Sequence, residues 1–432
     1  MRIINIQKKQ PKLNLANILF VLLIPGFFFY SYAVASSYIA ALPGGWFGIL
    51  SILSILCLAP TAILAFINSK GSVLSLLILF MVFLLFIASW AVFHYLMGSQ
   101  FQQNIVALEK SGRMVVLYFA LFYLGSYIFP EKWFTLILYL SFFGMILLTL
   151  INIDPSRMMF YAKVQFEVSE GVAKYQGFAR SFAATAIILI GITCRIYWQA
   201  ALTMISLLVL YFLGARSEFY GFVIVAFVSW LVAMRSSTLL IRLFFSAIFV
   251  CCLILFFSIQ ISEFSNRQFE IFKVFQSTSV ARRLQYLSQG WHYISNSVVL
   301  GDYAGQLRNG EFGSYIHNLL AAWRQFGILG FGLYFSLSIL SLLIPVNRVV
   351  FRESNDPNWR IALYMNCYTF ILSVAAKSVF GGLAPLSWGL TLNALRKEQT
   401  SYSTFLSRTP SGAKKDNRIG QLLRKSFAHK FV

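Results

Sequence analysis

Apolar residues form long runs that recur from one end of the chain to the other, separated by short polar segments. A run of about 20 apolar residues is long enough to cross the ~30 Å hydrocarbon core of a bilayer. Hydropathy predicts about twelve such spans. They lie near 15–35, 45–67, 72–97, 113–129, 132–152, 178–194, 196–213, 219–234, 239–260, 319–345, 360–380 and 383–395, the last of which is short.

These runs favour helices over strands. Lipid offers no hydrogen-bond partner to the backbone, so each span must satisfy its own N–H and C=O groups. The alternating segments of about ten residues that are typical of a membrane β-barrel are absent. We therefore predict an all-α fold, a polytopic transmembrane helix bundle, with residues 1–395 as the transmembrane domain.

Composition excludes a soluble domain of this size. Hydrophobic residues make up 59% of the chain and charged residues 11%, whereas a soluble globular protein carries about 25% charged residues. The net charge of +21 is better explained by cytoplasmic loops rich in Lys and Arg than by nucleic acid, which we do not expect as a partner.

Charge also orients the spans. With the N-terminus in the cytoplasm, most basic residues fall on inner loops and on the basic tail 396–432, for which we expect a cytoplasmic location and little ordered structure. Two longer segments, 153–177 and 261–318, then lie outside, which in a bacterium is the periplasm. This predicts a multi-pass protein of the bacterial inner membrane with both termini in the cytoplasm.

The larger outside segment contains an amphipathic pattern. Val280, Leu284, Leu287, Trp291 and Ile294 recur at intervals of three and four, which indicates one apolar helix face. Arg282 and Arg283 flank that face. Either the helix lies on the membrane with its arginines on lipid phosphates, or an arginine points into a functional site.

Further candidates lie at the outer ends of predicted spans. Arg216 and Glu218 stand between two apolar runs in Gly-Ala-Arg-Ser-Glu. An arginine in this place snorkels, pairs with an acid such as Glu218, or binds a ligand, and its guanidinium matches a pyrophosphate in geometry and charge. Arg180 adds to the basic character of the smaller outside segment, which could attract an anionic substrate.

His317 and Asn318 open the tenth span, followed by Gly327 and Gly330. A histidine at a helix start is usually a satisfied polar residue, but it can also be a general base near neutral pH. Arg324 is seven residues on, which predicts a shared helix face with His317.

Several classes of chemistry have no support in the chain. It has no Walker motif, no Gly-rich nucleotide loop and no cluster of metal ligands. We therefore expect neither a metal nor a cofactor. No acidic pair lies in the apolar spans, which leaves few candidates for hydrolysis by two carboxylates.

Taken together, these features resemble the O-antigen polymerase and O-antigen ligase superfamily of bacterial envelope glycosyltransferases. The resemblance rests on the span number, the late outside segment, Arg216 before a span, and an arginine that opens a helix leading to Trp291, Ile294, Asn296 and Gly301. It ends with His317-Asn318-Leu319 and the glycines at 327 and 330. The motif part covers only about 214–335.

Two departures from the family pattern stand out. Arg324-Gln325 stands where the family often has an acidic residue before the glycines. Val298-Val299-Leu300-Gly301 replaces the Pro-Leu-x-Gly that commonly ends the loop helix.

The resemblance implies a metal-independent transferase of the GT-C type whose donor is an oligosaccharide on undecaprenyl pyrophosphate. Arg216 and Arg283 would neutralise the departing pyrophosphate, His317 would position or deprotonate the acceptor hydroxyl, and Arg282, Arg180, Asn318, Arg324 and Glu218 would contact substrate. Besides the lipid bilayer, a chain-length regulator protein is a further partner that it suggests.

The exact reaction remains open. A polymerase joins lipid-linked repeat units, whereas a ligase transfers polymer to lipid A–core. The motif departures favour a polymerase, because polymerases diverge with their glycans. A flippase of lipid-linked oligosaccharide and a non-catalytic assembly scaffold are the alternatives from other classes.

Overall fold

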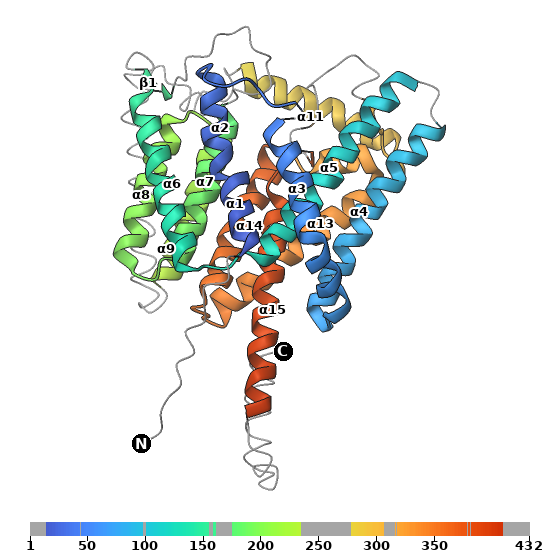
Figure 1. Cartoon of the computed structure of the whole chain (residues 1–432). Coiled ribbons are helices and arrows are strands. Elements are labelled where there is room, and N and C mark those ends of the chain that lie inside the picture. The colour runs from blue at the N-terminus through green and yellow to red at the C-terminus, as the bar shows by residue number, and fades with distance from the viewer. Residues whose placement is uncertain are drawn as a thin grey trace, which may run out of the picture.

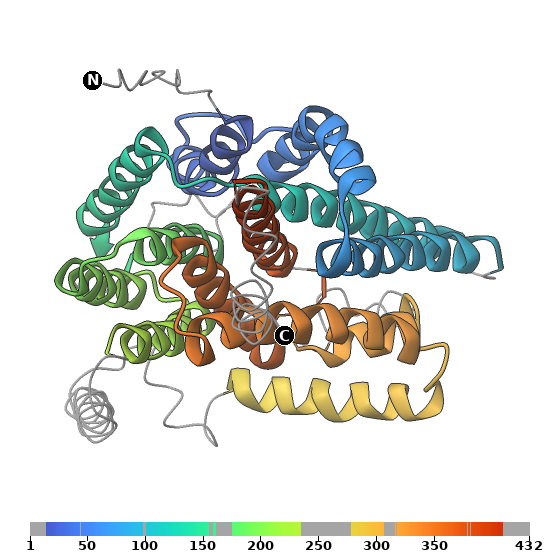
Figure 2. The ribbon, with the colours of Figure 1, turned by 90° about the horizontal axis from the view of Figure 1, so that it is seen from below.

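The protein is described from a computed structural model that covers residues 14–43, 45–97, 101–154, 159–160, 175–234, 278–305, 316, 318–377, 379–380 and 382–408. Almost all described secondary structure is helical (Figures 1 and 2). The exception is a short antiparallel pair, β1 (Ile153–Asp154) and β2 (Met159–Phe160).

The helices follow the predicted apolar runs. In chain order they are α1 (Leu15–Leu23), α2 (Pro25–Ala35), α3 (Gly45–Asn68), α4 (Gly71–Met97), α5 (Phe101–Tyr127), α6 (Lys132–Ile151), α7 (Tyr175–Ile192), α8 (Ile196–Phe212), α9 (Arg216–Ala233), α11 (Thr278–Asn296), α13 (Leu320–Val346), the π-helix η2 (Asn347–Phe351), α14 (Pro357–Ala375) and α15 (Ala384–Arg408).

The chain is a multi-pass helical membrane protein. Within its described part, six helical segments are long and apolar enough to cross a membrane, namely Leu15–Ala35, α3, α4, α6, α9 and Leu320–Phe351. Two shorter apolar helices, Gln176–Ile192 and Ile196–Phe212, lie among them. The predicted span 239–260 lies outside the described residues, so a total of about twelve spans stays a prediction.

Two helices extend beyond the apolar spans that were predicted for them. Helix α5 begins at Phe101 rather than near 113, and its polar first half carries an exposed i,i+4 ion pair between Glu109 and Arg113. Helix α15 continues to Arg408, past the predicted end at 395. Hydropathy marks only the apolar part of a helix, whereas side-chain pairs carry the backbone helix beyond it.

Polar contacts show which helix ends lie together at each end of the bundle. At the first, which we call the terminal end, Asn14 at the start of α1 donates to the carbonyl of Tyr127 at 2.9 Å. At the same end, Arg360 near the start of α14 donates to the carbonyl of Thr193 at 3.1 Å. Helix α11 lies across the opposite end, which we call the α11 end (Figure 1).

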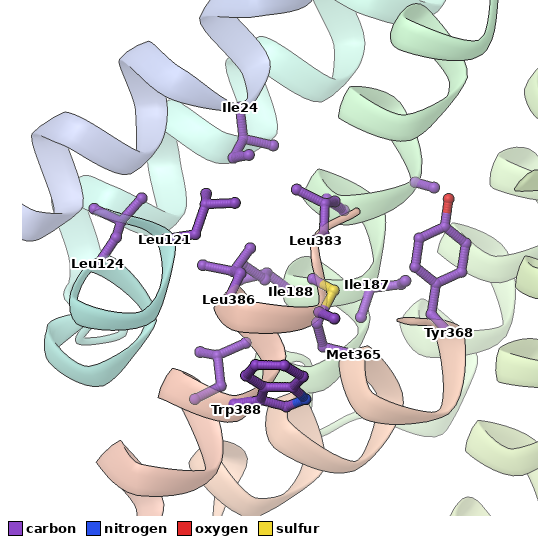
Figure 3. Close-up of a cluster of buried hydrophobic side chains, with 14 of the residues drawn as sticks. Ile24, Leu121, Leu124, Ile187, Ile188, Met365, Tyr368, Leu383, Leu386 and Trp388 are labelled. Carbon is purple, nitrogen blue, oxygen red and sulfur yellow. The ribbon is translucent and has the colours of Figure 1, made fainter. Parts of the chain in front are cut away.

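The core is apolar and tightly packed (Figure 3). Its closest helix crossing joins α5 to α15 at two glycines. A Cβ on Gly389 would stand 2.0 Å from the carbonyl oxygen of Phe122, and one on Gly125 would stand 2.3 Å from that of Leu386. Small residues permit this approach of two backbones, as at many helix crossings in membranes. Trp388 fills the core beside the crossing.

At the terminal end, α15 is fixed by charged and polar side chains. Lys397 donates to the side chain of Asn358 and lies 3.9 Å from the ring centre of Phe129. Glu398, the next residue, pairs with Arg348 at 3.3 Å. Partial burial lowers the pKa of Lys397 to about 8, and the nearby Asp356 carboxylate opposes this shift.

The lowered pKa of Lys397 predicts a pH dependence of stability. The folded chain binds fewer protons at this lysine than the unfolded chain between pH 8 and the ordinary lysine pKa of about 10.4. The free energy of unfolding should therefore rise with pH across that window. We expect the wild type to gain more thermal stability than Lys397→Gln between pH 7.5 and 9.5, measured in detergent. The exposed Lys132 supplies the control, Lys132→Gln, and equal pH profiles for wild type and Lys397→Gln would contradict the prediction.

Candidate functional site

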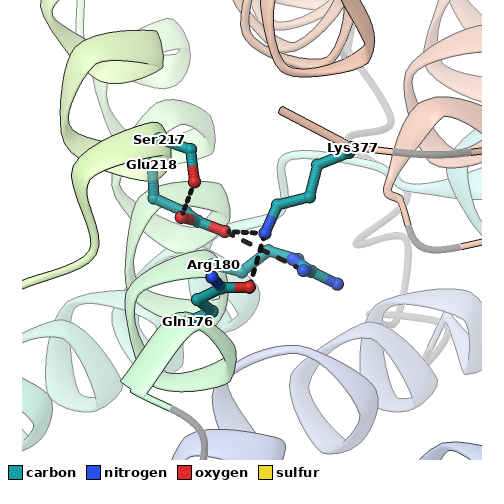
Figure 4. Close-up of polar contacts among 5 residues, drawn as sticks. All are labelled: Gln176, Arg180, Ser217, Glu218 and Lys377. Carbon is teal, nitrogen blue, oxygen red and sulfur yellow. Dashed lines mark hydrogen bonds and ion pairs between the residues drawn. The ribbon is translucent and has the colours of Figure 1, made fainter. Parts of the chain in front are cut away.

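A charged cluster lies at the α11 end, where α7 and α9 begin and α14 has just ended (Figure 4). Its centre is Glu218, in the first turn of α9, whose side chain is 0% exposed. The Nζ of Lys377 is 2.8 Å from Glu218 Oε1, and Nη2 of Arg180 is 3.8 Å from the same oxygen. Two cations, one from α7 and one from the segment after α14, therefore converge on one buried carboxylate.

Two neutral side chains add hydrogen bonds to the ion pair. Ser217 Oγ donates to the second carboxylate oxygen of Glu218 at 2.6 Å. Lys377 Nζ donates to Gln176 Oε1 at 2.9 Å. Burying a charge is costly unless it is paired and hydrogen-bonded. Glu218 and Lys377 meet both conditions.

Arg180 is less completely engaged. Its side chain is 26% exposed, the most open of the three charged groups. Its Nε is buried and has no hydrogen-bond partner among the described residues. The hydroxyl of Tyr368 is likewise buried without a partner, and the Tyr368 ring packs beside Gly221, one turn along α9 from Glu218. The site thus holds hydrogen-bonding groups that the described residues leave unused.

The cluster has an excess of positive charge. Arg180 and Lys377 contribute two positive charges against the one negative charge of Glu218. Arg216 begins α9, is half-buried, and precedes Glu218 by two residues. The N-terminus of a helix adds a partial positive charge of its own. Such a site suits an anion.

The structure joins two of the predicted site residues, Arg180 and Glu218. The described ion pairs of Glu218 are with Arg180 and Lys377, whereas a pair with Arg216 was one of the alternatives that the sequence left open. Lys377 is the residue that sequence reasoning missed. It stands near the end of the predicted span 360–380, and an ionisable residue in an apolar span is a signal of function in itself.

Arg324 occupies a second polar cluster at the same end. Its Nε and Nη2 donate to Asp302 Oδ2 at 3.2 and 3.1 Å, and its guanidinium lies 4.3 Å from the ring centre of Tyr293. Its neighbour Gln325 accepts from the backbone N–H of Ala304 at 3.2 Å. Arg324 and Gln325, which stand where the family often has an acidic residue, thus both bind the segment that follows α11.

The other residues named from the sequence surround this second cluster. Asn318 accepts at 3.0 Å from the backbone N–H of Leu320, the first residue of α13. His317 lies outside the described residues. The helix face that His317 is predicted to share with Arg324 therefore stays a prediction. Arg282 and Arg283 lie in the second turn of α11, and their side chains are outside the described part of the chain.

The amphipathic helix is confirmed as a helix, and only part of its apolar face is covered. Ile294 is buried and Leu287 packs with it against Ile316 and the start of α13. Leu284 and Trp291 remain exposed. Exposed apolar side chains beside a membrane-embedded bundle are consistent with contact to lipid.

Comparison with known proteins adds no family. No protein-family model matches the chain. No curated protein matches it either. The functional interpretation therefore depends on the site itself.

Proposed function

We propose that the protein is a membrane-embedded glycosyltransferase that polymerises oligosaccharide repeat units carried on undecaprenyl pyrophosphate. The observation that carries this proposal is the Arg180–Glu218–Lys377 cluster, which presents excess positive charge and unused donors at one end of a membrane bundle. A lipid-linked pyrophosphate keeps its polyprenyl chain in the bilayer and its charged headgroup near the membrane surface, where the end of a membrane bundle lies. The cluster offers the charges that such a headgroup needs.

The chemistry requires little beyond charge and positioning. An acceptor hydroxyl attacks the anomeric carbon, the bond from that carbon to the pyrophosphate oxygen breaks, and undecaprenyl pyrophosphate leaves with its electron pair. The hydroxyl proton passes to a base, the role that the family resemblance implies for His317. Cations placed on the leaving group stabilise the charge that develops there. Arg216 begins α9, and Arg180 lies in the second turn of α7 at the same end of the bundle, which supports this use.

A flippase of the same lipid is the second candidate, and one observation favours it. Glu218 is fully buried within the bundle and paired with Lys377. Buried ionisable pairs of this kind also serve ion coupling in transporters. The polymerase and the flippase differ in the intermediate that accumulates when the protein is missing, and this difference can be measured.

The test is a lipopolysaccharide and capsule gel on a deletion strain of the source bacterium. The strain is complemented with wild type, Arg180→Ala, Arg283→Ala or His317→Ala. The matched control is Arg113→Ala, because Arg113 is an exposed arginine in a surface ion pair. Membrane blots check that all variants reach similar levels. We expect the ladder of long glycan to be lost in the deletion strain and in the three site variants, and to persist in the control.

The residual material identifies the reaction. Core that carries a single repeat unit indicates a polymerase. Bare core with long glycan stranded on the lipid carrier indicates a ligase. Bare core with repeat units confined to the cytoplasmic face of the membrane indicates a flippase. An unchanged ladder in the deletion strain excludes all three.

A further inference from the structure

The three charged residues of the cluster are not equivalent. Lys377 is within hydrogen-bond distance of Glu218, whereas Arg180 stands 3.8 Å away, too far for a hydrogen bond. The Lys377 side chain is 10% exposed and that of Arg180 is 26% exposed. Lys377 is directed inward to the carboxylate, and Arg180 keeps contact with the space outside.

We infer that Arg180 is the cation that binds the pyrophosphate, and that Lys377 is a positioning residue that occupies Glu218 so that Arg180 stays free for the ligand. This inference rests on the proposed function and divides the roles within its site. Nothing in the family resemblance concerns Lys377.

The contacts of the buried pair support this division. Lys377 Nζ forms an ion pair with Glu218 Oε1, Ser217 donates a hydrogen bond to the other carboxylate oxygen, and Lys377 also donates to Gln176. A ligand that took Lys377 would leave the buried carboxylate with Arg180, 3.8 Å away, as its nearest described cation, and separating a buried pair costs several kcal/mol. A ligand that takes Arg180 breaks no hydrogen bond between described residues. Arg180 also has a planar fork of donors that matches two phosphate oxygens at once.

Lys377 would then affect ligand binding indirectly, through Glu218 and Arg180. Without Lys377, Glu218 would carry a buried charge whose nearest described cation is Arg180. A movement of about 1 Å would close the 3.8 Å gap to hydrogen-bond range. Glu218 would then compete with the ligand for the guanidinium. Removing the carboxylate at the same time should release Arg180 again.

If Lys377 acts through Glu218, adding E218Q to K377M should restore ligand affinity. If Lys377 binds the ligand directly, adding E218Q should not restore it. The double-mutant cycle that tests this uses full-length protein in detergent and measures the dissociation constant of farnesyl pyrophosphate, with farnesol as the probe that lacks phosphate. We expect Arg180→Met and Lys377→Met each to weaken binding by tenfold or more, about the worth of one lost charged hydrogen bond. We expect the double variant E218Q/K377M to recover to within about threefold of wild type.

Folding is checked for each variant by size-exclusion profile and thermal midpoint. Replacing both members of a buried pair is often neutral for stability, so the double variant remains testable even if Lys377→Met misfolds. Arg113→Met is the matched control and should bind as wild type does.

The outcomes separate this inference from the proposed function. If E218Q/K377M binds as weakly as Lys377→Met, or if Arg180→Met binds normally, the assignment is overturned while a lost glycan ladder would still support the transferase. If wild type binds farnesyl pyrophosphate no better than farnesol, the site does not take a pyrophosphate and the inference fails. If the cycle shows recovery but the ladder never depends on the protein, the division of roles stands and the transferase does not.

Discussion

Replacing Gly327 by alanine is expected to abolish correct folding of the junction between α13 and the segment that follows α11. Gly327 lies inside α13 with φ +65° and ψ −172°, a backbone conformation that is almost exclusive to glycine. A Cβ at this position would stand 2.0 Å from the carbonyl oxygen of Val299. That neighbour is backbone, so no side-chain rotation can relieve the clash.

The surrounding contacts show why this strain is maintained. The helix breaks its own hydrogen bonding at Gly327, and the N–H of Ile328 lies 3.2 Å from the carbonyl of Val298 instead. Trp323 Nε1 donates to the same carbonyl at 2.9 Å. Gly301, with φ +75°, approaches Gly327 from the other side, since a Cβ on it would be 2.6 Å from the N atom of Gly327. The segment after α11 is thus seated directly on a kink in α13.

We expect Gly327→Ala to cost more than about 3 kcal/mol, the sum of a disallowed conformation and an unrelieved overlap. Fluorescence-detected size exclusion and thermal unfolding measure the loss of fold, and the glycan ladder measures the loss of function. Gly332, one and a half turns on in α13, is the matched control because a Cβ there meets nothing within 4 Å. Gly332→Ala should fold normally. Normal folding of Gly327→Ala would show that the backbone contact with the post-α11 segment is not needed.

This junction also explains what the sequence could and could not predict. Span positions follow from local composition, so hydropathy located most helices. The glycines at 301, 327 and 330 were recognised only as elements of a family pattern. For Gly301 and Gly327 the physical reason is an approach of two backbones from segments about 25 residues apart, and a single sequence does not reveal such an approach. Gly330 differs, because a Cβ there would meet the side chains of Phe326 and Phe86 and no second backbone.

The charged cluster illustrates the same limit. Arg180 and Glu218 were candidates because each is a charged residue beside an apolar run. Their partnership with Lys377 joins α7, α9 and the end of α14, and the charge pattern alone suggested the nearer Arg216 as partner for Glu218. Residue types and hydropathy locate ionisable groups along a span. Only the packing of distant helices decides which of them meet.

Substitutions at Asp302 can decide whether Arg324 belongs to the substrate site. Arg324 and Asp302 have side chains only 4% and 14% exposed and are joined by two hydrogen bonds. Removing one member of a buried pair leaves the other charge uncompensated, at a cost of about 3–5 kcal/mol. We expect Asp302→Asn to lower the thermal midpoint strongly. Glu109→Gln, which breaks an exposed pair, should change the unfolding free energy by less than about 1 kcal/mol.

The double variant D302L/R324M then separates structure from catalysis. Apolar side chains of similar volume can replace a buried ion pair with little loss of stability, so the fold should recover. If Arg324 serves only to fasten α11 and the segment after it to α13, the glycan ladder should return together with the thermal midpoint. A recovered midpoint without a ladder would instead show that Arg324 contacts the substrate. Because Arg324 already lies between Asp302 and the ring of Tyr293, we expect the ladder to return.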